Sequence, residues 1–412
     1  MQAESPIRDQ AKIKDCLEYI EQYWDRIICY QVIDDGTLIG LPHHYISPNH
    51  DMFQELYYWD SYFIALGLES TPREDKVVEI TENLLYLMTR FGRIPNASRY
   101  YHLSRSQPPL LSSLVLKSFR IKFGTKTDHE LAQGWLKERF EILKLEYHHV
   151  WRGKKFPDHR EVFRGLSRYY DLNIWHNAAE AESGWDMTPR FENRCLDFLP
   201  IDLNCLLFQY ELDFLEIAEL LGDKEESSRW RIIAEARRQS VHDLMWDEER
   251  GYFFDYDYHF QHRSTFSSIA GFFALWSKIA TQEQAERIVK EQLPKFETEY
   301  GVVTTLEWHR TEDEEPKQWA WPNGWAPLHW IVVSGLAKYG FHTESKRIAK
   351  KWVDLAADVF AVNKKMYEKY DVVGGTRGMS DRYPDQVGFG WTNAIFFRFV
   401  KYLESGQLWY RS

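Results

Sequence analysis

Apolar residues recur at spacings of three and four through most of this chain, and this repetition restricts the fold more than any other feature. One such stripe runs from Leu203 to Leu221 and stops at Gly222. That spacing places apolar side chains on one face of a helix, and a following glycine is a typical helix end. The same reasoning predicts helices over 9–31, 77–91, 112–122, 136–147, 203–221, 225–245, 266–280, 282–293, 325–339 and 343–359.

Strand patterns are few and short. The stretch 246–257 is typical of a hairpin that turns at charged residues and Gly251, and 360–371 follows a helix in the same way. About twelve helices of ordinary length, with some long loops, fit 412 residues. This repetition predicts an all-α fold, a closed ring of six helix pairs with short β-hairpins in the loops that build the site. No Gly/Ser-rich or Pro-rich linker divides the sequence, so we expect one domain over 1–412.

The charge balance restricts the partners. The chain has 51 Lys+Arg and 62 Asp+Glu, a net charge of −11, which argues against nucleic acid because phosphates are bound by Lys and Arg. No apolar run approaches the ~18 residues of a membrane span. Met1–Ser5 has no basic and apolar leader pattern, and the four cysteines form no CxxC pair. We therefore expect a soluble cytoplasmic protein with no membrane partner; its oligomeric state cannot be predicted.

Aromatic and polar residues gather in a few segments without helical periodicity. These are 53–62, 94–109, 181–190 and 318–327, with 367–371 and 388–393 near the end. Sugars are bound by rings that stack on C–H faces and by polar groups that contact hydroxyls. There is no phosphate-binding glycine loop, no HExxH and no G-x-S-x-G, so we expect no cofactor and no metal. Carboxylates in aromatic, polar loops favour glycoside hydrolysis by a general acid and a general base.

These segments resemble, in the same order along the chain, the motifs of the trehalase family of inverting α-glucosidases. The resemblance implies an (α/α)6 toroid that hydrolyses a small-molecule α-glucoside without a cofactor. It covers about residues 50–400. The matching stretches are Phe53-x-Glu55-x-Tyr57-x-Trp59-Asp60, Ile94-Pro95-Asn96, Leu103–Pro109, Glu182–Asp186, Glu368–Val372 and Gly388–Asn393.

The same resemblance assigns roles to individual residues. Asp186 would protonate the glycosidic oxygen, and Glu368 would activate water on the opposite face of the sugar, with the two carboxyl groups roughly 6.5–9.5 Å apart. Neighbouring Trp185 would supply the apolar surroundings that an acid needs at neutral pH. Trp319 and Trp325 fit core packing equally well. The implied substrate-binding residues are Phe53, Trp59, Asp60, Asn96, Arg105, Gln107, Trp185, Gln318, Trp319, Trp325 and Arg382.

Three positions depart from the family pattern. Met52 stands where an arginine is usual, Ala320 where the family has Asp, and Arg382 where an acidic residue precedes Tyr-Pro. If they face the second sugar, these residues favour a smaller or acidic aglycone, as in glucosylglycerol or glucosylglycerate, over trehalose. Arg382 would contribute nothing if it pairs with Asp381.

Other functions stay open at this stage. The first alternative is an ordinary α,α-trehalase. Another is a sugar-binding toroid without turnover, against which the paired acid and base argue. A toroid lyase or epimerase would need a catalytic Tyr/His constellation, which no comparable motif carries.

Overall fold

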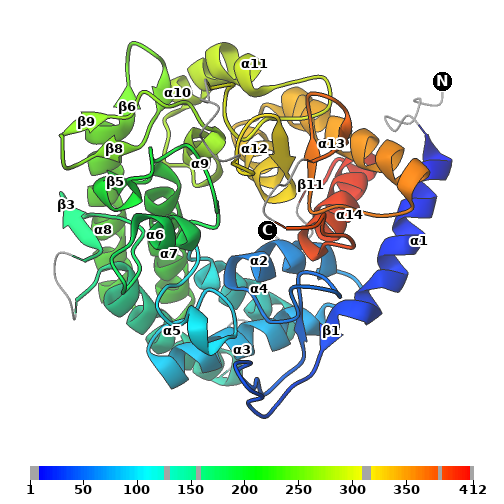
Figure 1. Cartoon of the computed structure of the whole chain (residues 1–412). Coiled ribbons are helices and arrows are strands. Elements are labelled where there is room, and N and C mark those ends of the chain that lie inside the picture. The colour runs from blue at the N-terminus through cyan, green and yellow to red at the C-terminus, as the bar shows by residue number, and fades with distance from the viewer. Residues whose placement is uncertain (1–8, 125–129, 155–158, 309–316, 379–382, 409–412) are drawn as a thin grey trace.

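The structure is a computed structural model that describes residues 9–124, 130–154, 159–308, 317–378 and 383–408 (Figure 1). Its larger elements are helices. Their bounds are α1 Gln10–Ile27, α2 Tyr58–Leu68, α3 Asp75–Phe91, α4 Leu111–Phe123, α5 Glu130–Leu145, α6 His176–Glu182, α7 Ile201–Leu220, α8 Lys224–Met245, α9 Phe273–Trp276, α10 Gln282–Arg287, α11 Leu293–Phe296, α12 Ala326–Lys338, α13 His342–Asn363 and α14 Gly390–Ser405.

Within the described ranges, the helices form the predicted toroid. Six of them contact one another in a closed order, α2, α4, α7, α9, α12, α14 and back to α2. Helices α1, α3, α5, α8 and α13 pack against this inner ring from outside, and Figure 1 shows the ring with its outer helices. The ring closes tightly where α2 meets α14, since a Cβ on Gly67 would lie 2.5 Å from the Cα of Ala394.

Burial differs between the helices of the two rings. All 11 residues of α2 are buried, whereas α8 buries 7 of its 22 residues. A helix with a polar face shows the helical period, but α2 is covered on every side and does not. The prediction therefore missed α2, and it also missed α6 and α14, whereas the inner helices α4, α7 and α12 were predicted.

One predicted helix is wrong in part. The stretch 266–280 holds a 3₁₀ turn, Ile269–Phe272, followed by the short α9. A side chain at Gly271 would lie 2.4 Å from the Tyr252 ring, so this segment packs directly onto its neighbour. The helix predicted at 282–293 is confirmed and continues to Phe296, with a π-helical turn at Ile288–Gln292 between α10 and α11.

The strands are short and lie in loops. Trp246 pairs with Phe253, so the predicted hairpin at 246–257 is confirmed. The hairpin predicted at 360–371 begins later, because α13 continues to Asn363 and buries Phe360. The strands are β1 Ile28–Cys29, β2 Tyr45–Ile46, β3 Glu161–Phe163, β4 Leu166–Ser167, β5 Phe198–Leu199, β6 Trp246–Asp247, β7 Tyr252–Phe253, β8 Tyr256–Asp257, β9 His262–Arg263, β10 Asn323–Trp325, β11 Lys369–Asp371 and β12 Thr376–Arg377.

One small sheet matters for the site. Strand β11 lies between β10 and β12, and its antiparallel register places Lys369 opposite Trp325. The sheet therefore joins two of the aromatic, polar segments that are far apart in the sequence. Among the described helices, none combines the length and the apolar character needed to cross a membrane.

Candidate active site

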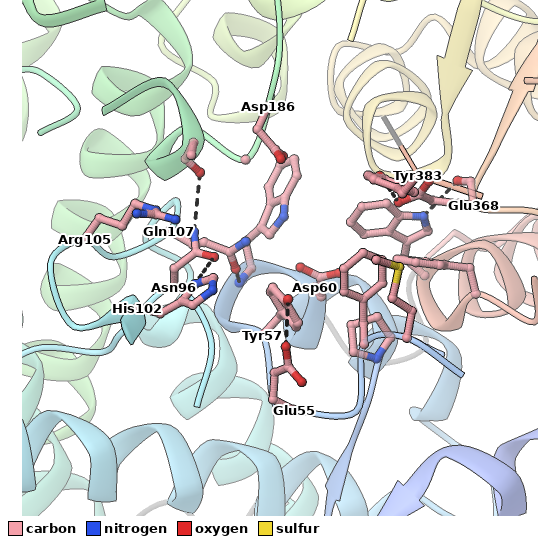
Figure 2. Close-up of a pocket in the computed structure, with 18 of the residues that line it drawn as sticks. Glu55, Tyr57, Asp60, Asn96, His102, Arg105, Gln107, Asp186, Glu368 and Tyr383 are labelled. Carbon is pink, nitrogen blue, oxygen red and sulfur yellow. Dashed lines mark hydrogen bonds between the residues drawn. The ribbon is translucent and has the colours of Figure 1, made fainter. Parts of the chain in front are cut away.

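A cavity of about 450 Å³ brings together residues from segments distant in the sequence (Figure 2). Its lining draws on the start of α2 and on the loops around residues 96–107, 181–186 and 383–391. This volume is typical of a site for a small organic ligand. The lining includes these residues singled out from the sequence: Phe53, Trp59, Asp60, Asn96, Arg105, Gln107, Asp186, Trp319 and Glu368.

The remaining predicted residues lie elsewhere. Trp185 and Trp325 are fully buried and are not among the lining residues. Gln318 is also buried, and its Nε2 donates to the carbonyl oxygen of Asp186 at 2.5 Å. Arg382 lies outside the described residues. Trp185, Trp325 and Gln318 therefore pack behind the residues that line the cavity. For Trp325, this agrees with the core-packing alternative.

The loop after α6 carries Asp186 to the cavity. Gly184 adopts a φ of +76° against the Trp59 ring, where a Cβ would lie 2.7 Å from the ring carbons. Only glycine allows this close approach without strain. At the end of α6, the buried Glu182 carboxylate accepts from the backbone amides of Ser106 and Tyr170 at 2.7 Å. These bonds tie the Asp186 segment to the loop that carries Arg105 and Gln107.

Glu368 directly precedes β11 and is 4% exposed. Its Oε1 accepts from the Tyr383 hydroxyl at 2.9 Å, and its Oε2 pairs with Nζ of Lys369 at 2.7 Å. Its carbonyl oxygen accepts from Nε1 of Trp391 at 3.0 Å. Both carboxylate oxygens and the backbone of Glu368 are thus held by neighbouring groups.

Asp60 lies in the first turn of α2 and is buried. Burial raises its pKa well above the ordinary value, and the nearby charges of Glu368 and Asp186 raise it further. Figure 2 shows Asp186 and Glu368 entering the cavity from different segments, with Asp60 below both of them in this view. Three carboxyl groups therefore share one cavity, and for Asp60 the neutral form is favoured.

Asn96, His102 and Arg105 lie across the cavity from Glu368 and Tyr383 (Figure 2). The Asn96 amide donates to the Ser106 carbonyl at 3.1 Å, so its oxygen is the acceptor for Nδ1 of His102 at 3.0 Å. Burial lowers the pKa of His102 to about 4, and the charges of Arg105 and Arg99 contribute. His102 is therefore a neutral hydrogen-bonding group at neutral pH.

The sequence analysis missed several lining residues. Glu55 and Tyr57 lie inside the first motif, and the Tyr57 hydroxyl donates to Glu55 at 3.0 Å. Tyr383 belongs to the Tyr-Pro motif that follows Arg382, but this motif did not indicate a role for Tyr383 itself. No spacing of residues in the sequence indicated that His102 lines the site. Of the departures from the family pattern, Met52 lines the cavity and is 50% exposed, whereas Ala320 is buried and is not among the lining residues.

The described side chains offer no cluster for a metal ion. Among them, no group of three or more His, Cys, Asp and Glu could hold one.

Two curated proteins that are similar to this chain are named as trehalases. The probable trehalase of Eremothecium gossypii is 32% identical over 442 aligned positions, which cover 91% of this chain and 59% of that protein. The cytosolic neutral trehalase of Saccharomyces cerevisiae is 33% identical over 443 positions, covering 90% and 58%. The chain thus spans somewhat more than half the length of these relatives.

Solved structures show the same architecture. The neutral trehalase Nth1 from Saccharomyces cerevisiae superposes with a TM-score of 0.78 at 28% identity, over 95% of this chain and 80% of that chain. The GH63 mannosylglycerate hydrolase from Thermus thermophilus, in complex with glucose, gives 0.66 at 17% identity over 93% and 98%, and it shares the fold alone.

The family model described as trehalase matches residues 2–180 and 174–404, which together cover nearly the whole chain. The chain therefore belongs to the trehalase family.

Proposed function

We propose that this protein is an inverting glycoside hydrolase that releases glucose from a small α-glucoside, with α,α-trehalose as its first candidate substrate. The observation that carries the proposal is that Asp186 and Glu368 line one cavity although they come from segments 182 residues apart. The names of the relatives, probable trehalase and cytosolic neutral trehalase, support trehalose as the substrate. They also support a cytoplasmic location.

In the proposed reaction, the Asp186 carboxyl group gives its proton to the glycosidic oxygen as the bond between this oxygen and C1 breaks. The Glu368 carboxylate takes a proton from a water molecule, whose oxygen bonds to C1 from the opposite face. Trp59 and the polar residues Asp60, Asn96, Arg105 and Gln107 hold the glucosyl unit. These steps use side chains and water alone.

A second candidate substrate rests on one observation. Met52 lines the cavity at a position where the family pattern has an arginine. A thioether cannot donate hydrogen bonds to a second sugar, and a site that loses such donors discriminates less well for the hydroxyls they contacted. Glucosylglycerol and glucosylglycerate, which have smaller aglycones, are therefore the alternative substrates.

The test compares Asp186→Asn and Glu368→Gln with the wild type in a glucose-release assay on trehalose, glucosylglycerol and glucosylglycerate. General acid and base groups each contribute about 10²- to 10⁴-fold, so each variant should lower kcat at least ~10²-fold on the best substrate. Glu235→Gln, the same change on the surface of α8, is the control and should leave kcat unchanged. A wild type that binds but hydrolyses no glucoside would show a sugar-binding toroid without turnover.

A further inference from the structure

Five buried side chains form one continuous stack behind the cavity. The Trp319 and Trp325 rings lie parallel, with centroids 3.7 Å apart and an interplanar angle of 2°. Trp185 stacks on the Trp319 side at 5.8 Å and 18°. A cation closes each end, because the Arg190 guanidinium lies 4.8 Å from the Trp185 centroid and Nζ of Lys369 lies 5.0 Å from that of Trp325. We call this arrangement the tryptophan column.

The two ends of the column adjoin the two proposed catalytic groups. Trp185 directly precedes Asp186, and Lys369 directly follows Glu368 and pairs with its carboxylate at 2.7 Å. Arg190, at the first end, is fixed by ion pairs of 2.6 Å to Asp202 and Asp255. The column thus runs from the segment that carries the acid to the segment that carries the base.

Backbone bonds hold the column in register with both segments. The Trp319 amide donates to the Met187 carbonyl at 3.1 Å, one residue after Asp186. At the other end, Trp325 is paired with Lys369 across β10 and β11. A shift of either segment would therefore require the stacked rings to shift too.

Contacts between rings, and not hydrogen bonds of the indole nitrogens, hold Trp185 and Trp325, and Trp391 packs edge-to-face against Trp325 with centroids 6.0 Å apart. Within the described residues, the buried Nε1 atoms of Trp185 and Trp325 have no hydrogen-bond partner. Ring contacts and cation–π contacts therefore position these two residues, and a phenylalanine would keep a ring without removing any hydrogen bond.

We propose that the tryptophan column fixes the distance between the carboxyl groups of Asp186 and Glu368 and their relative orientation. In this proposal, Trp185 and Trp325 are positioning residues. The inference rests on the proposed acid and base roles of those carboxyl groups. Such catalysis depends on geometry, because a displacement of about 1 Å at reacting groups can cost ~10²-fold in rate. Trp319, the middle ring, also lines the cavity and is therefore not used as a test position.

The experiment replaces the outer rings. Trp325→Leu, Trp325→Phe and Trp185→Leu are compared with Trp330→Leu, a buried tryptophan of α12 that lies outside the column. Thermal unfolding identifies the folded variants. For these, kcat and KM are measured on the best glucoside among trehalose, glucosylglycerol and glucosylglycerate, and on α-glucosyl fluoride, whose leaving group needs no proton.

Trp325→Leu should lower kcat at least ~10-fold on both substrates, with KM changed less than ~3-fold, because the base is misplaced for either leaving group. Trp185→Leu should lower kcat as much on the glucoside but less than ~3-fold on the fluoride, because only proton donation is impaired. Trp325→Phe, which keeps a ring, should recover only part of the lost rate. Trp330→Leu should leave kcat within ~2-fold of the wild type.

The inference is overturned if the column variants match Trp330→Leu in kcat, or if Trp185→Leu loses as much rate on the fluoride as on the glucoside. If Trp325→Leu does not fold, Trp325→Phe decides, with an expected loss of ~3-fold or more on both substrates. If Asp186→Asn and Glu368→Gln retain activity, the proposed function fails and the inference fails with it. If they lose activity while the column variants do not, the inference alone fails.

Discussion

The hydroxyl of Tyr383 donates a 2.9 Å hydrogen bond to Oε1 of Glu368, on the side of the carboxylate that Lys369 leaves free. Burial raises the pKa of Tyr383 well above its ordinary value, and the charges of Glu368 and Asp186 add to the rise. Tyr383 therefore stays a donor at any pH at which the enzyme would work. This bond fixes the rotation of the carboxylate about its last side-chain torsion.

Tyr383→Phe removes this bond and keeps the ring. A hydrogen bond to a charged group contributes about 1.5–3 kcal/mol, so we expect kcat to fall about 10-fold or more, with a smaller change in KM. Steady-state kinetics on the best substrate measure both. The control is Tyr402→Phe, whose hydroxyl donates to Ser345 far from the cavity. Equal kcat values for the two variants would mean that Tyr383 does not orient Glu368.

On a glucoside whose aglycone is not a sugar, such as glucosylglycerol, the glucose released should be the β-anomer, because one displacement by water inverts an α-glucoside. Trehalose should give equal amounts of β- and α-glucose, because the leaving glucose keeps its own α configuration. Proton NMR of the fresh reaction distinguishes the anomers before they equilibrate. Initial α-glucose from glucosylglycerol, or α-glucose alone from trehalose, would require a covalent intermediate, and Glu368 would then be a nucleophile rather than a base.

Met52→Arg should raise kcat/KM for trehalose relative to glucosylglycerol, because a guanidinium restores donors that a second sugar can use. Met52→Leu, which keeps an apolar side chain, should leave the ratio unchanged. The two ratios are measured by competition between the substrates. A ratio that does not move in Met52→Arg would place the second sugar away from this residue.

Arg382 lies outside the described residues. Its expected role, binding an acidic aglycone, can be tested by substitution. If its guanidinium binds a carboxylate, Arg382→Ala should lower kcat/KM for glucosylglycerate and leave that for glucosylglycerol unchanged. If trehalose leads the panel by tenfold or more and Arg382→Ala changes nothing, the enzyme is an ordinary trehalase with altered motifs.

His329 predicts an acid-dependent loss of stability. It is fully buried, accepts from the Val302 amide at 3.0 Å through Nε2, and Nδ1 donates to the Trp325 carbonyl at 2.9 Å. Burial lowers the pKa of His329 to about 3. Between the ordinary value near 6.5 and pH 3, the unfolded chain binds a proton that the folded chain does not. Stability therefore falls as the pH falls, by up to ~1.4 kcal/mol per pH unit from this residue.

Urea unfolding at pH 7, 6 and 5 measures this dependence. His329→Gln should be less stable at pH 7, because the buried hydrogen bonds are disturbed, but its stability should fall less steeply toward pH 5. Parallel slopes for the variant and the wild type would contradict the prediction. Above pH 7, His329 contributes no further change, since it is neutral in both states.

Outer helices could be predicted from the sequence, because solvent on one side of α3 or α8 leaves a polar face and a readable period. The inner helix α2 could not, since a helix buried on all sides has no such contrast. In the site, the motifs identified Asp186, Glu368 and Asn96, and all three residues line one cavity. Trp319 and Trp325 share one motif, and only their packing decides that Trp319 lines the cavity while Trp325 lies behind it.

The contact between Gly67 of α2 and Ala394 of α14 has a consequence for biosynthesis. During translation, α2 leaves the ribosome more than 300 residues before its partner helix α14. In this interval, the side of the largely apolar α2 that later packs against α14 is exposed to solvent. Phe389 and Trp391, which complete the cavity wall, emerge with that partner. The nascent chain therefore acquires its binding site only after α14 has left the ribosome, and until then α2 exposes apolar surface of the kind that chaperones bind.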